Sequence, residues 1–78
     1  LYPNPTDDRF TVVSSKDWSE KLVSIVVYDI LGKQVLRGTY ENTGRFEKTI
    51  DVSNLNSGMY LVRVENGSIF STRKLIVR

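Results

Sequence analysis

The chain has 78 residues, enough for one small domain, and a domain of this size buries only about 60% of the surface that its unfolded chain exposes. It contains no Cys and no His, which excludes disulfides and thiolate metal sites and removes the commonest general base of enzymes. Eleven Lys and Arg against nine Asp and Glu give a net charge of +2, and because the basic residues are interspersed, no nucleic-acid-binding surface is indicated.

No stretch approaches the roughly 20 apolar residues that a membrane-spanning helix needs. The sequence also has no signal-peptide pattern. Because it opens at Leu1 rather than Met, we expect it to be a piece cut from a longer protein, which leaves room for a signal peptide on the missing part.

Short runs with the composition and two-residue alternation of β-strands dominate the chain. In chain order, the predicted strands are residues 9–13, 22–29, 34–40, 45–52, 59–65 and 68–77. The run 22–29 is apolar on both faces, which is typical of a strand in the middle of a sheet. The only helical segment we expect is a single turn, at most, within residues 16–21.

Turn residues separate these runs. Asn66-Gly67 predicts a two-residue type I′ hairpin between the fifth and sixth strands. Gly32, within residues 29–33, predicts a longer hairpin between the second and third strands. The sequence of residues 42–44 predicts a similar hairpin between the third and fourth strands.

The connection between the fourth and fifth strands is polar except for Leu55. Such a residue favours a crossover from one sheet to another, with the Leu packed under the core. Six strands with regular turns in so short a chain predict an all-β fold, an Ig-like antiparallel β-sandwich of six to seven strands. Residues 1–5 could supply a short edge strand, where Pro3 and Pro5 are tolerated.

Four segments carry a family likeness in their order along the chain. They are Leu1-Tyr2-Pro3-Asn4-Pro5, Val27-Tyr28-Asp29-Ile30-Leu31-Gly32-Lys33-Gln34-Val35, Leu55-Asn56-Ser57-Gly58-Met59-Tyr60-Leu61-Val62-Arg63-Val64 and Ser71-Thr72-Arg73-Lys74-Leu75-Ile76-Val77. Over its whole length the chain resembles the type A C-terminal sorting domain of cargo proteins of the type IX secretion system in Bacteroidetes.

The resemblance implies a function in export. Cargo enters the periplasm on a signal peptide, and its C-terminal domain is recognised by the outer-membrane translocon. A sortase-like peptidase commonly removes the domain, and the cargo is released or attached to lipopolysaccharide at the cell surface. The sorting-signal residues that the resemblance implies are Pro3, Asn4, Pro5, Gly32, Gly58, Tyr60, Arg73, Lys74, Leu75, Ile76 and Val77.

Several of these residues also have a structural interpretation. Tyr60 comes early in a strand, after a loop with an inward-pointing Leu. This arrangement predicts a tyrosine corner, in which the Tyr60 hydroxyl forms a hydrogen bond with the loop backbone near Leu55. Arg73 and Lys74 are typical of an edge strand protected from aggregation, and the same edge is open to strand addition by a partner. Trp18 is either a ring folded over the end of the sandwich or an exposed contact for a partner or a sugar.

No cofactor or metal site is indicated. Asp7 and Asp8, taken with Asp29 or Asp51, lack the loop spacing of a calcium site, and neither a nucleophile beside a base nor a phosphate-binding loop is found. We therefore expect a domain that is not an enzyme. The alternative function is a non-catalytic adhesion or carbohydrate-binding module similar to fibronectin type III domains. The oligomeric state is left open.

Overall fold

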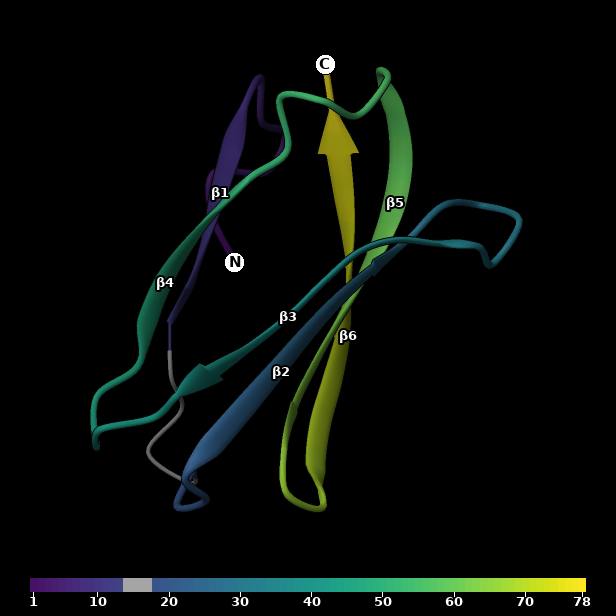
Figure 1. Cartoon of the computed structure of the whole chain (residues 1–78). Helices are drawn as coiled ribbons and strands as arrows, with labels where there is room; N and C mark the ends of the chain where they lie inside the picture. Colours follow the sequence, from purple (N-terminus) through teal and green to yellow (C-terminus); the bar gives the residue numbers. More distant parts are fainter. Residues whose placement is uncertain (14–17) are drawn as a thin grey trace.

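A computed structural model describes residues 1–13 and 18–78. It contains six strands in two antiparallel sheets and, among the described residues, no helix (Figure 1). The strands are β1 Arg9–Val13, β2 Leu22–Tyr28, β3 Gln34–Glu41, β4 Glu47–Asp51, β5 Gly58–Asn66 and β6 Ile69–Val77. β1 pairs with β4, and the other four strands form a sheet in the order β3-β2-β5-β6. The predicted all-β sandwich is confirmed.

The hydrophobic core lies between the two sheets. Alternate residues of each strand point into it, as the period of two requires. The fully enclosed members include Phe10 from β1, Val23, Ile25 and Val27 from β2, Val62 from β5 and Leu75 from β6. Leu55 packs against this core from the connection between β4 and β5, which is where the chain crosses between sheets. The predicted crossover is therefore confirmed.

β2 occupies the middle of the four-stranded sheet, as its apolar composition predicts. It pairs with β3 on one side and with β5 on the other. Its outward-facing Val26 is only 5% exposed, so the second face is partly covered as well. The predicted hairpin after β2 also forms, with Gly32 at φ +84°, a conformation that a residue with a side chain rarely adopts.

The predicted hairpin at residues 42–44 is wrong. β3 and β4 belong to different sheets, so this segment is a crossover. The Asn42 backbone N–H donates to the Lys21 carbonyl, and its side-chain amide donates to the carbonyls of Trp18 and Glu20. These bonds hold Asn42 beside the segment before β2. The chain then leads Phe46 into the core, where it is 3% exposed.

The hairpin between β5 and β6 forms, but its turn is not type I′. Asn66 is still paired with Ile69, so the two loop residues are Gly67 and Ser68. Gly67 has φ +63°, and no non-glycine residue among those described has a positive φ. This is the type II′ pattern, with Gly at the first central position. Asn66 lies in the strand and not in the turn. Its buried side chain accepts from the Glu20 N–H and donates to the carbonyls of Glu20 and Leu22.

Residues 1–5 do not form a seventh strand. Tyr2 makes an isolated antiparallel bridge to Thr11, and Thr6 makes a parallel bridge to Val77. The predicted turn within residues 16–21 falls partly on residues 14–17, which lie outside the described residues. No helix in the described part of the chain is long and apolar enough to cross a bilayer.

Candidate functional site

The end of β6 is held by the side chain of Asn4. The Asn4 amide Nδ2 donates to the Lys74 carbonyl at 2.6 Å, and its Oδ1 accepts from the Ile76 N–H at 3.0 Å. One side chain thereby satisfies an outward-facing acceptor and donor of an edge strand, a task that a neighbouring strand normally performs. The flanking Pro3 and Pro5 are exposed and have no N–H to offer the edge.

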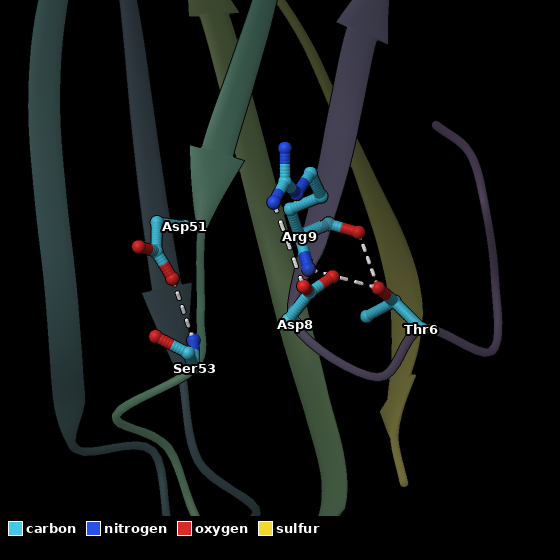
Figure 2. A network of polar contacts seen from close by, with 5 residues as sticks. All are labelled: Thr6, Asp8, Arg9, Asp51 and Ser53. Carbon is cyan, nitrogen blue, oxygen red and sulfur yellow. Dashed lines mark hydrogen bonds and ion pairs between the residues drawn. The ribbon is translucent and has the colours of Figure 1, made fainter.

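Thr6 extends this contact by one step along the strand. Its backbone N–H donates to the Ile76 carbonyl and its carbonyl accepts from the Arg78 N–H, both at 2.8 Å. Thr6 is itself 1% exposed. Its hydroxyl donates to the Arg9 carbonyl and accepts from the Arg9 N–H at 3.1 Å, at the start of β1 (Figure 2). We call the Asn4 and Thr6 contacts to residues 74–78 the N-terminal clasp.

β6 is an edge strand, and near its end some side chains are buried in the core while others are exposed to solvent. Leu75 and Val77 are buried, at 0% and 3% exposure. Arg73 and Lys74 are exposed, and Ile76 is intermediate. The predicted terminal motif thus combines two core residues with a basic pair that faces solvent.

Tyr60 forms the predicted tyrosine corner. Its hydroxyl donates to the Asn56 carbonyl at 2.6 Å, and the residue is 8% exposed. Tyr60 is paired with Leu75, and Gly58 with Val77. The corner therefore fixes the start of β5 directly beside the terminal motif of β6.

The polar groups around the clasp are mostly paired near the surface. Arg78 Nε lies 3.3 Å from Asp7 Oδ1 and Arg9 Nη2 lies 3.6 Å from Asp8 Oδ2, both well exposed, so these ion pairs add little stability.

At the end of β4, hydrogen bonds from the side chain and the backbone N–H of Ser53 lower the pKa of Asp51 (Figure 2).

Comparison with known protein families supplies the deciding observation. Residues 1–78, the whole chain, match the family described as the secretion system C-terminal sorting domain. The chain belongs to this family. A comparison with curated proteins found no match.

Membership sets the function at the level of the family. The sorting domain is a C-terminal signal for type IX secretion, and its cargo is secreted or displayed at the cell surface. Such a signal interacts with the type IX secretion machinery, and the family is not a catalytic one. A module for adhesion or carbohydrate binding is not favoured.

The first, third and fourth segments that carry the family likeness meet at the β6 edge of the sorting domain. Asn4 contacts β6 through the clasp, and β5 aligns Gly58 and Tyr60 with the terminal strand. The second segment begins in β2, which pairs with β5, but its Gly32 lies in the hairpin between β2 and β3, toward the opposite edge of the sheet. Trp18 packs against Phe46, with the ring centroids 5.9 Å apart, and is partly buried against the core.

The sequence analysis missed two polar residues that hold this arrangement. No role was predicted for Thr6, and Asn66 was predicted only as a turn former, yet both are 1% exposed. Asn-Gly marks a turn by its composition. Composition carries no sign that their partners lie far away along the chain, at residues 76–78 and 20–22.

Proposed function

We propose that the secretion machinery reads the folded sorting domain at the end of β6. The residues that would carry recognition are the exposed pair Arg73 and Lys74. Leu75 and Val77 would anchor this strand in the core, and the Asn4 clasp would hold it at the Lys74 carbonyl and the Ile76 N–H. Pro3 and Pro5 would shape the clasp, and Gly58 and Tyr60 would fix the neighbouring strand. Gly32 would act separately, by forming the hairpin between β2 and β3.

One observation carries this proposal. Asn4 is more than 50 residues away from both Tyr60 and Leu75 in sequence, yet the segments of all three meet at one edge. Burial of Leu75 and Val77 accounts for their apolar character. It does not account for two adjacent cations on the same strand, which are free to meet an acidic surface.

The specific partners follow from the family's route of export. The outer-membrane translocon would dock the exposed strand, and a sortase-like peptidase would then remove the domain, with release or surface attachment of the cargo. Residues 1–78 would act as one independent sorting domain of a longer secreted protein. The chain itself would perform no catalysis, since it has neither His nor Cys and the family is not catalytic.

Charge reversal in a reporter fusion tests the proposal. Residues 1–78 are joined to the C-terminus of a periplasmic reporter with its own signal peptide, in a bacterium that has the type IX system. Arg73→Glu with Lys74→Glu should leave the reporter in the periplasm. Lys33→Glu with Arg37→Glu changes the net charge equally on the opposite side of the sheet, and should be secreted like the wild type.

Deleting residues 73–78 would be a poorer test. The deletion removes Leu75 and Val77 from the core and the strand partner of Thr6, so it would unfold the domain as well as remove the signal. Both charge-reversal variants must therefore give wild-type circular dichroism. Equal secretion of the two folded variants would contradict the proposal.

A further inference from the structure

Part of the β6 edge is left without a strand partner. The clasp bonds the carbonyls of Lys74 and Ile76 and the N–H groups of Ile76 and Arg78. Because both backbone groups of a residue face the same side of an antiparallel strand, those of Phe70 and Thr72 and the Lys74 N–H face outward too. Within the described residues, these groups meet only the Arg73 guanidinium, 3.4 Å from the Thr72 carbonyl.

A groove lined by mostly apolar residue types, together with Ser71 and Arg73, runs beside this free stretch. It has a volume of about 460 Å³, within the range of about 300–1,000 Å³ usual for ligand sites. Leu1, Val12, Val13 and Trp18 line it opposite the β6 residues Ile69 to Ser71 and Arg73. The groove therefore lies between the β1 side of the small sheet and the free edge of the large one.

The inner face of β6 is uncovered at the same place. Ile69 and Arg73 lie on the face that includes the buried Leu75, yet Ile69 is 42% exposed and Arg73 is also exposed. On the other side of the groove, Val13 is 38% exposed. Within the described residues, the two-stranded sheet does not cover this end of β6, so its core-facing positions Ile69 and Arg73 border solvent.

We propose that this groove binds an extended segment of a partner protein, which adds to β6 as a fifth strand along Phe70 to Lys74. Its alternate apolar side chains enter the groove against Val13 and Ile69, while its backbone bonds the outward-facing groups of Phe70, Thr72 and Lys74 and replaces the Arg73 guanidinium at the Thr72 carbonyl. Arg73 is the only charged residue that lines the groove among those described, so an acidic side chain in the segment finds a partner there. The inference rests on the proposed function, since it names how the machinery engages the strand that it reads.

The clasp fixes where such a strand can pair. Asn4 and Thr6 already fill the outward positions from the Lys74 carbonyl to the Arg78 N–H. A partner strand must therefore end at Lys74, with the basic pair at its end. A helix would leave the free backbone groups of Phe70 and Thr72 unsatisfied, which is why an extended segment suits this edge.

Proline substitution at the edge tests the inference. Thr72→Pro removes an outward N–H and obstructs strand addition, but leaves the inward bonds to β5 in place. Thr39→Pro is the matched control. Thr39 is an exposed Thr on β3, the opposite edge, and by the same alternation its N–H faces away from β2, because the Asn42 N–H faces toward it. Thr72→Ala keeps the N–H and controls for the side chain.

The probe is the blocked peptide Glu-Val-Thr-Val-Glu-Val-Thr, titrated into the chain while the fluorescence of Trp18, the only Trp, is followed. We expect binding that slows amide exchange at Phe70, Thr72 and Lys74. Thr72→Pro should weaken binding by about tenfold or more, whereas Thr39→Pro and Thr72→Ala should bind like the wild type. A peptide of the same composition with its Val residues consecutive should bind more weakly.

Absence of binding, or binding that Thr72→Pro leaves unchanged, would overturn the inference. So would dimerisation of the chain through β6, seen as a concentration-dependent mass that Thr72→Pro abolishes. If Thr72→Pro fails to fold, the amide-exchange pattern of the wild-type chain decides, and protection of β3 instead of β6 would refute the groove. In the reporter fusion, normal secretion of folded Thr72→Pro would also refute it, and the charge-reversal result would still decide the proposed function separately.

Discussion

The Asn4 side chain makes two hydrogen bonds to the terminal strand that Asn4→Ala would remove. The two bonds join Asn4 to the Lys74 carbonyl and the Ile76 N–H. Each such bond contributes about 0.5–1.5 kcal/mol net. Because the site is exposed and water can replace the lost partner in part, we expect a loss of about 1–2 kcal/mol in the free energy of unfolding.

Thermal unfolding followed by circular dichroism measures this loss. For a domain of 60–100 residues, 1 kcal/mol lowers Tm by about 4–8 °C, so Asn4→Ala should lower it by about 4–16 °C. Amide exchange of Ile76 should also become faster, because its N–H loses its acceptor. Asn54→Ala is the control, since Asn54 is exposed in a loop and bonds to nothing in the described part of the chain. A Tm for Asn4→Ala equal to that of the control would refute the clasp.

Three further substitutions test the framework around the site. Tyr60→Phe removes the hydroxyl that bonds the Asn56 carbonyl and should cost about 1 kcal/mol in urea unfolding, whereas Tyr28→Phe should change little; equal values would count against the corner. Asn66→Ala removes three bonds to Glu20 and Leu22 from a buried site and should cost about 2–4 kcal/mol, so a near-neutral result would contradict this brace. Asp51 has a lowered pKa, so its contribution to stability is present above the ordinary carboxyl pKa of about 3.9 and is lost as the pH falls through the native value. Asp51→Asn should therefore lose less stability than the wild type between about pH 5 and pH 2.5, and parallel pH profiles would show that Asp51 plays no part.

Strand positions and faces could be predicted because burial follows a period of two. Alternation within residues 45–52 places Ile50 and Val52 on the face opposite Thr49, and in the structure Ile50 and Val52 are buried while Thr49 is exposed. The tyrosine corner was also predictable, since Leu55 and Tyr60 carry a local spacing signal. These features depend on residues close together in sequence.

Long-range polar contacts could not be predicted in this way. Nothing in the sequence around Asn4 shows that its amide bonds a strand 70 residues away. The same reason explains the two turn errors. Asn66 and Asn42 are residue types that favour turns, but in both the side-chain amide donates a hydrogen bond to the Glu20 carbonyl, in the segment that precedes β2.

The candidate site was predicted as a set of residues by family resemblance, and its geometry came only from the structure. Resemblance placed weight on Tyr60 and Lys74 without joining them. In the structure, the β5–β6 register places Tyr60 beside Leu75, and the clasp places Asn4 beside the same strand. Together these contacts bring the separate motifs to one edge. Gly32 shows the limit of the resemblance, since it lies on the far side of the sheet.

Site-specific photo-crosslinking in a secreting cell tests the central claim most directly. A photoreactive amino acid is placed at Lys74, and in a separate cargo at Lys33, and the adducts formed during export are identified. If the secretion machinery recognises the exposed edge of β6, the photoreactive residue at position 74 should crosslink to an outer-membrane component of the type IX system, and the one at position 33 should not. Capture of that component from position 33 alone, or equally from both positions, would contradict it.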